Sequence, residues 1–317
     1  MNPAVYILGG PDGYRTITDD WGAASVDLDL LAGPATMMVL MGRASAYGQP
    51  LSGTGEGDDD VQGGVLIDPE RKVLLFFALE GPSVHMRTRR ATLALVRAAW
   101  PGWDVRWAYG GRTDLRAHAG LDPADDPDRD KRAREGDLSE TDAAVPAVRS
   151  LGVTVVTLDG PDRCHPVCYA FDHPVMYGPA LLDWLAAATD HGAYHELAVA
   201  GLHVDTERRR VGWWVTNHQI HHDTAAARWP GWTVEFWEDR WAEHRTASGG
   251  RFDPTEPDDA AALTEVRDAA LQHWTPILYD QDGLPCLAGL DHRGPVSRQG
   301  PAARAAIAEA YRSVTGG

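Results

Sequence analysis

Two short segments of the chain alternate large apolar residues with polar ones. Residues 103–107 read WDVRW and residues 232–236 read WTVEF. Successive side chains of a β-strand point to opposite faces, so a period of two predicts a strand that buries one face. The two segments therefore predict two strands of the same kind, about a third and about three quarters of the way along the chain.

Other patterns predict the elements around these strands. Apolar runs at residues 5–8 and 153–158 predict strands that lead into Gly-Pro-Asp turns. Residues 88–99 predict a helix that stops before Pro101, because a residue that precedes proline is disfavoured in the α conformation. Further helices are predicted where proline can occupy a first turn, at Pro34, Pro179 and Pro301.

The chain repeats itself. Residues 64–77 (GVLIDPERKVLLFF) align without a gap to residues 201–214 (GLHVDTERRRVGWW). Three more landmarks recur in the same order: Gly10-Pro11-Asp12 as Gly160-Pro161-Asp162, Gly33-Pro34-Ala35 as Gly178-Pro179-Ala180, and Trp100-Pro101-Gly102-Trp103 as Trp229-Pro230-Gly231-Trp232. Ordered recurrence of this kind predicts an internal duplication.

The predicted fold is α+β, because strands and helices are mixed without a regular βαβ alternation. We expect a duplicated unit of mostly antiparallel strands with two to three helices. The first repeat unit spans residues 1–121, a charged linker with a helix spans 122–150, and the second repeat unit spans 151–255. Residues 256–317 are interpreted as a helix and a truncated third unit, whose opening strand is 276–283 (PILYDQDG) and whose helix starts at Gly300-Pro301-Ala302.

Composition narrows the class of protein. Hydrophobic residues make up 44% and charged residues 24%, as in ordinary globular proteins. We expect no membrane segment and no secretory signal, and the three cysteines suit a reducing, cytoplasmic location. The formal charge of -17 disfavours nucleic acid as a partner, since nucleic-acid binders carry a basic surface. It favours a basic protein partner.

Residues 217–223 (NHQIHHD) form the strongest candidate for metal binding. His218, His221, His222 and Asp223 are suitable ligands for a divalent metal, the one cofactor that the sequence suggests. On a helix the three histidines would cluster, whereas on a strand His221 would point away from the other two. A polar surface loop explains the same residues without a metal.

The twelve tryptophans support two interpretations. Exposed indole rings anchor many protein interfaces, so Trp107, Trp237 and Trp241 are candidate binding residues. The Trp-Pro-Gly-Trp elements, by contrast, join a helix to a strand in both repeats, which favours rings that fill the core.

Two further sets of residues recur. Cys168 with Asp172 and His173 resembles Cys286 with Asp291 and His292, which could form a thiolate–imidazole or metal site or merely contribute buried packing. Asp68 with Arg71 and Asp205 with Arg208 span tight turns, where we expect them to stabilise the turn.

The functional hypothesis that follows is a non-catalytic, acidic binding protein that engages a basic protein partner, for example an immunity-type or antitoxin-type neutraliser. Two alternatives stay open. One is a metal-assisted enzyme that uses the histidine cluster. The other is an assembly subunit that docks through the partial unit at its C-terminus.

Overall fold

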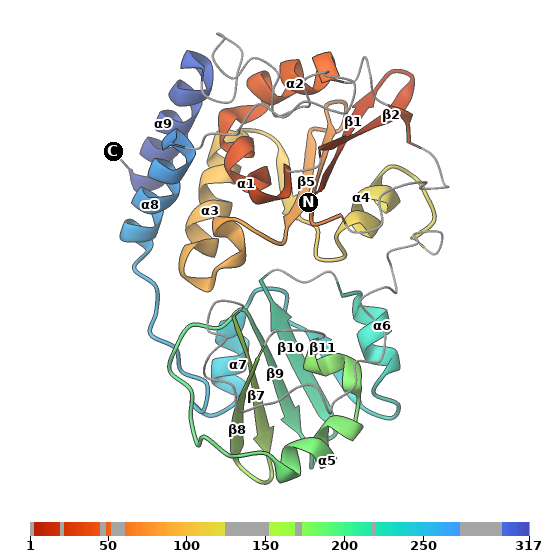
Figure 1. Ribbon diagram of the computed structural model, residues 1–317, viewed down its shortest axis with the longest axis vertical. Coiled ribbons are helices and arrows are strands. Elements are labelled where there is room, and N and C mark those ends of the chain that lie inside the picture. The colour runs from red at the N-terminus through yellow and green to blue at the C-terminus, as the bar shows by residue number, and fades with distance from the viewer. Residues whose placement is uncertain are drawn as a thin grey trace. The chain divides into compact units, whose positions relative to one another are not determined.

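The computed structural model describes residues 3–19, 22–44, 49–51, 61–123, 152–168, 173–216, 220–272 and 300–316. The chain divides into two compact units (Figure 1). The first unit comprises Met1–Asp128 together with Pro257–Gly317, and the second comprises Arg129–Glu256. The linker predicted at 122–150 lies outside the described residues from position 124 onward.

The first unit is built on a six-stranded sheet in the order β3-β2-β1-β4-β5-β6. Its strands are β1 (Ala4–Gly10), β2 (Gly13–Asp19), β3 (Gln49–Pro50), β4 (Gly63–Asp68), β5 (Val73–Ala78) and β6 (Asp104–Trp107). Its α-helices are α1 (Val26–Asp29), α2 (Gly33–Ala44), α3 (Met86–Ala99), α4 (Arg112–His118), α8 (Asp259–Gln272) and α9 (Pro301–Thr315). The central strands β4 and β5 are buried along their whole length.

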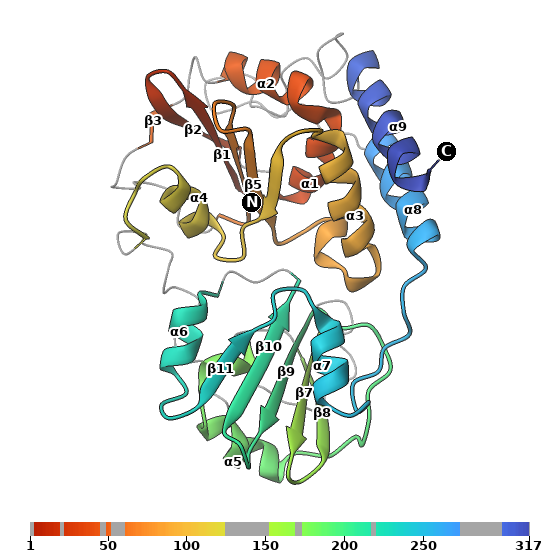
Figure 2. The ribbon, with the colours of Figure 1, turned by 180° about the vertical axis from the view of Figure 1, so that it is seen from behind.

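The second unit is built on a five-stranded sheet in the order β11-β10-β9-β7-β8. Its strands are β7 (Val153–Asp159), β8 (Arg163–Cys168), β9 (Ala200–Asp205), β10 (Arg210–Val215) and β11 (Thr233–Phe236). Its helices are the 3-10 helix η8 (Pro174–Tyr177) and the α-helices α5 (Ala180–Ala187), α6 (His222–Ala227) and α7 (Trp241–Ala247). Figure 2 shows α7 lying across one face of this sheet, while α5 lies on the other.

The two sheets share one topology. The order β2-β1-β4-β5-β6 in the first unit matches β8-β7-β9-β10-β11 in the second, strand by strand. The α+β class and the repeated sheet are therefore confirmed. Both sheets are mixed, however: β1 runs parallel to β4 and β5 to β6, as β7 does to β9 and β10 to β11. Parallel neighbours need a long crossover, and the predicted helices provide these crossovers.

The C-terminal helices belong to the first unit. Helices α8 and α9 lie against α3 and bury small or aliphatic residues there, namely Ala262, Leu263, Val266, Ala303, Ile307 and Ala310. The helix predicted from Gly300-Pro301-Ala302 is thus present as α9. The opening strand predicted at 276–283 lies outside the described residues, so the third unit stays a prediction.

The Trp-Pro-Gly-Trp elements make equivalent packing contacts and hydrogen bonds in both units. Trp100 and Trp229 are each 1% exposed, and each meets the second tryptophan of its element edge-on. The indole N–H of Trp100 donates to the carbonyl of Leu30 at 2.7 Å, and that of Trp229 donates to the carbonyl of Val175 at 2.7 Å. The predicted core role is confirmed.

This matched hydrogen bond gives a prediction. Trp100→Phe and Trp229→Phe each remove an indole hydrogen bond to a buried carbonyl and shrink a buried ring, so each variant should lose about 2 kcal/mol of unfolding free energy. Urea unfolding measures the loss, with Trp103→Phe as the control for removing an indole from the same element. A loss no larger than that of the control would show that the carbonyl contact contributes little.

Candidate functional site

The histidine cluster is only partly described. His221 occupies the N-cap position of α6 without a capping hydrogen bond from its side chain, and His222 and Asp223 lie in the exposed first turn. The carboxylate of Asp223 accepts a hydrogen bond from the backbone N–H of Thr224 at 3.0 Å. Among the described residues, no group of three or more His, Cys, Asp or Glu side chains could hold a metal ion. Because His218 lies outside those residues, the four-residue metal site stays a prediction.

The three candidate binding tryptophans have different surroundings. Trp107 is half-buried, with the guanidinium of Arg89 4.2 Å from its ring centroid. Trp241 is 5% exposed. Trp237 is half-buried, and its ring lies against the backbone of Gly212 in β10. Of the three, Trp237 and Trp107 therefore retain an accessible part of the indole.

The recurring Asp and Arg residues stabilise turns, as predicted. In the first unit the backbone N–H of Arg71 donates to Asp68 at 3.0 Å, and in the second that of Arg208 donates to Asp205 at 2.8 Å. Asp68 also accepts hydrogen bonds from Tyr14 at 2.8 Å and from His118 at 3.1 Å. Burial acts to raise the pKa of Asp68, but these hydrogen bonds outweigh it and hold the pKa below its usual range.

The sheet faces that α4 and α7 cover differ in chemistry. In the first unit this face is an apolar cluster that includes Ile7, Leu66, Phe77 and Leu115. The aligned positions of the second unit hold Thr157, His203, Trp214 and His244. Small residues keep the covering helix close in both cases: a Cβ on Gly64 would meet Leu115 at 2.9 Å, and one on Gly201 would meet His244 at 2.4 Å.

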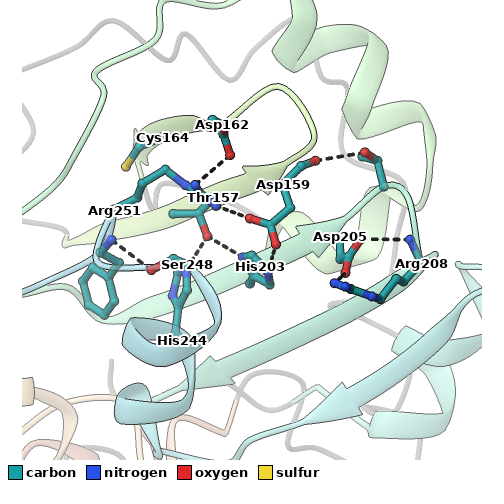
Figure 3. Close-up of polar contacts among 12 residues, drawn as sticks. Thr157, Asp159, Asp162, Cys164, His203, Asp205, Arg208, His244, Ser248 and Arg251 are labelled. Carbon is teal, nitrogen blue, oxygen red and sulfur yellow. Dashed lines mark hydrogen bonds and ion pairs between the residues drawn. The ribbon is translucent and has the colours of Figure 1, made fainter.

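Trp214, His244, Thr157, His203 and Asp159 of the second unit form one hydrogen-bonded chain, which we call the buried network; Figure 3 shows the part from His244 to Asp159. The indole N–H of Trp214 donates to Nδ1 of His244 at 3.0 Å. Nε2 of His244 lies 2.8 Å from the hydroxyl of Thr157, and that hydroxyl lies 2.9 Å from Nδ1 of His203. Nε2 of His203 then faces the carboxylate of Asp159 at 3.4 Å. These residues come from β10, α7, β7 and β9.

Trp214 and Asp159, at the two ends of the buried network, determine on which atom each proton of the network lies. An indole N–H can only donate, so Nδ1 of His244 accepts and its proton lies on Nε2. That proton goes to the Thr157 hydroxyl, which therefore donates to Nδ1 of His203. The proton of His203 then lies on Nε2 and points at Asp159, which can only accept. With both imidazoles neutral, each donor meets one acceptor.

Burial keeps both imidazoles neutral. It lowers the pKa of His203, although the nearby Asp159 acts in the opposite direction. It lowers the pKa of His244 well below the ordinary value, and the positive charges of His203 and Arg251 would add to this effect. His244 is fully buried, and Phe252 stacks on its ring with centroids 4.8 Å apart.

The network reaches solvent at Asp159, whose side chain is 31% exposed. Arg251 forms ion pairs with Asp159 and, at 2.9 Å, with Asp162. Nearby Cys164 is fully buried, and burial raises the pKa of its thiol to about 12, which leaves it protonated and unreactive at neutral pH.

The order Thr157, His203, Asp159 resembles a nucleophile, a base and an orienting carboxylate. The hydroxyl cannot act as a nucleophile on an outside substrate, because Thr157 is 0% exposed. The same hydroxyl already receives the proton of His244. In this geometry the buried network holds α7 on the sheet rather than presenting a reactive group.

The sequence carries a signal for this network in the alignment of its two repeats. Aligning the repeats shows polar residues at positions where the first unit has Ile7, Leu66 and Leu115. Several coordinated apolar-to-polar changes on one sheet face indicate a shared hydrogen-bonded cluster, because a single one would leave a buried polar group unpaired.

No protein family, curated protein or solved structure matches this chain. Of the helices in the described ranges, none has the length and apolar composition needed to cross a membrane.

Proposed function

We propose that this protein is a non-catalytic binding protein that engages a basic protein partner through the connection between β11 and α7. The proposal rests on one observation: four acidic residues flank a half-buried tryptophan in this part of the sequence, and the indole N–H of that tryptophan donates to one of them, Glu235, at 3.4 Å. These residues are Glu235, Trp237, Glu238, Asp239 and Glu243, which we call the acidic corner. An immunity-type or antitoxin-type neutraliser is a concrete form of this function.

Exposure and charge support the acidic corner as a contact surface. The side chain of Glu235 is 43% exposed and that of Glu243 is 50% exposed, and Glu238 is exposed as well. Arg210 pairs with Glu235 and Arg240 with Glu243, and Glu238 adds an exposed carboxylate beside these pairs. An aromatic ring bordered by carboxylates suits arginine or lysine side chains of a partner.

The corresponding segment of the first unit lacks this character. After β6 it reads Ala108-Tyr109-Gly110-Gly111, without an acidic residue before α4. The duplicated scaffold is the same in both units, so the acids are not needed for the strand-to-helix connection. Their presence in the second unit is consistent with a role outside the fold.

The backbone of Glu238 adds a second indication. Its φ is 57°, a left-handed conformation that costs a non-glycine residue about 1 kcal/mol. The carbonyl of Glu238 accepts a hydrogen bond from the N–H of Val215 at 2.8 Å, which holds the residue in place. A glycine would be easier to accommodate, so glutamate at this position suggests that its side chain is used.

The buried chemistry of the second unit is compatible with a non-catalytic role. Thr157, His244 and Cys164 are each 0% exposed, so a substrate could not reach them without a rearrangement. The net charge of -17 would speed the encounter with a basic partner and make binding depend on salt.

Charge reversal tests the proposal. Full-length protein is used to capture basic proteins from its own cells, and bound complexes are identified by native mass spectrometry. The double variant Glu238→Lys/Glu243→Lys should bind the captured partner at least about tenfold more weakly. The control Asp12→Lys/Glu70→Lys makes the same charge change at exposed positions of the first unit and should bind nearly as well as the unchanged protein.

The outcomes separate the hypotheses. Equal weakening by both double variants would show a general charge effect and contradict a role for the acidic corner. Failure to recover any partner, with a bound metal in its place, would favour the metal-assisted enzyme instead.

A further inference from the structure

The second unit holds α7 on its sheet through the buried His244, which can take up a proton, whereas the corresponding residue of α4 in the first unit is a leucine. Helix α4 has a different imidazole contact with its sheet, from His118 to Asp68 at 3.1 Å. His244 projects from α7 and meets Trp214 of β10 and Thr157 of β7. Its counterpart on α4 is Leu115, which lies in the apolar cluster of the first unit. The two helices therefore provide a comparison within one molecule.

We propose that the buried network is a pH-sensitive latch, which holds α7 against the sheet at neutral pH and releases it when the network takes up a proton. This inference does not depend on the proposed partner, because it concerns the attachment of α7 alone. It also goes beyond the proposed binding function, since it assigns a conformational response to the residues of the buried network.

The mechanism of release follows from the atoms that carry protons in the buried network. An added proton on His244 must go to Nδ1, since Nε2 already carries one. Nδ1 then faces the indole N–H of Trp214 at 3.0 Å, and neither group can accept. Two donors directed at each other in a fully buried site lose their hydrogen bond and repel, so the contact between α7 and β10 must open.

A proton on His203 has a weaker but parallel effect. It would go to Nδ1, which now accepts from the Thr157 hydroxyl. Thr157 would then receive protons from both imidazoles and lose the acceptor for its own. The carboxylate of Asp159 partly offsets the new charge on His203.

Other charged and titratable groups surround the network. Asp205 on β9 acts on His203 together with Asp159, and Arg251 opposes a positive charge on either imidazole. Cys164 on β8 stays a neutral thiol. His173, the N-cap residue of η8, would also oppose a charge on His244 if it were itself protonated. Arg251 carries a fixed positive charge that acts on His244, and a proton on His203 would add a second, which favours opening over stable burial of an imidazolium.

Hydrogen exchange on the full-length protein tests the latch. Protection of the α7 amides, corrected for the intrinsic effect of pH on exchange, is measured at pH 7.5 and pH 5.0. We expect protection in α7 to fall at least about tenfold more than in α4. Equal changes in α7 and α4 would overturn the proposal.

The chain itself supplies the variant that should remove the response. Replacing the network with the residues of the first unit gives Thr157→Ile/His203→Leu/Trp214→Phe/His244→Leu. In this variant the protection of α7 should no longer depend on pH. A dependence as steep as in the unchanged protein would show that other groups release α7.

A measurement on the unchanged protein covers the case in which this variant does not fold. Proton–nitrogen NMR of the imidazoles should show neutral His244 and His203 with Nε2 protonated at pH 7.5. His244 should gain its second proton over the same pH range in which α7 loses protection. Opening of α7 while His244 stays neutral would overturn the latch.

Discussion

Gly212→Ala is expected to lower the free energy of unfolding of the second unit by about 3 kcal/mol, because an added methyl would overpack the site. A Cβ at this position would lie 1.8 Å from the indole of Trp237, a distance that no real contact allows. The ring follows β11 and is held by its own backbone, whose N–H donates to the carbonyl of Trp213 at 2.7 Å. The indole must therefore move or β10 must distort.

The first unit shows how the same space can be filled differently. There the strand residue is Leu75 and the residue after β6 is Ala108, whose N–H donates to the carbonyl of Phe76 at 2.8 Å. The first unit thus has a large residue on the strand and a small residue after β6. The second unit has glycine on the strand and tryptophan after β11. The double variant Gly212→Leu/Trp237→Ala should therefore recover much of the stability that Gly212→Ala loses.

Urea unfolding of the variants measures both effects. Gly42→Ala is the control, because Gly42 lies in α2 with nothing near its missing Cβ, and alanine there should slightly stabilise the helix. A Gly212→Ala protein as stable as this control would contradict the packing argument. So would a double variant that is less stable than Gly212→Ala.

His173→Asn is expected to make the second unit markedly less sensitive to acid. Burial lowers the pKa of His173 to about 3, against the ordinary value of 6.5. Below pH 6.5 the unfolded chain binds a proton that the folded protein does not, so the free energy of unfolding falls as the pH drops towards 3. The loss is about 1.4 kcal/mol per pH unit, or roughly 3 kcal/mol at pH 4.5.

Asparagine suits this position because it keeps the acceptor. Nδ1 of His173 accepts a hydrogen bond from the N–H of Val175 at 3.1 Å and caps η8, as an asparagine carbonyl can. The variant loses the ring contact with Trp213, so it should be about 2 kcal/mol less stable at pH 7.5. The gap should close or reverse at pH 4.5.

Urea unfolding at both pH values checks this result. His195→Asn is the matched control, since it makes the same change at an exposed imidazole of the same unit. An unfolding free energy that falls equally in His173→Asn and in the unchanged protein would show that the imidazole is not the acid-sensitive group. The latch variant described above separates the contribution of His203 and His244 from that of His173.

Much of the architecture could be predicted because it depends on local patterns. Residues 64–77 and 201–214 align without a gap and share the same turn residues, so the repeat and its turns could be predicted from the sequence. The Trp-Pro-Gly-Trp elements likewise combine a helix stop, a turn and a strand start within four residues. The parallel strand pairs were not predicted, since pairing across a crossover joins residues far apart in the chain.

The buried network shows the opposite case. Thr157, His203 and His244 are separated by dozens of residues, and nothing local distinguishes them from exposed polar residues of strands and helices. Only the register of β7 beside β9, with α7 on that face, brings their side chains within hydrogen-bond distance. The metal site predicted within residues 217–223 stays a prediction, because residues 217–219 lie outside the described part of the chain.

The sequence by itself determined the duplication, the α+β class, the turns stabilised by Asp68 and Asp205, and the core role of Trp100 and Trp229. Each follows from spacing, turn chemistry or apolar pattern within a short segment. Only the tertiary structure decided that the two units are filled differently, with hydrocarbon under α4 and a hydrogen-bonded chain under α7. The reason is physical: a polar residue is tolerated inside a protein only with its partners, and partners are assigned by the fold.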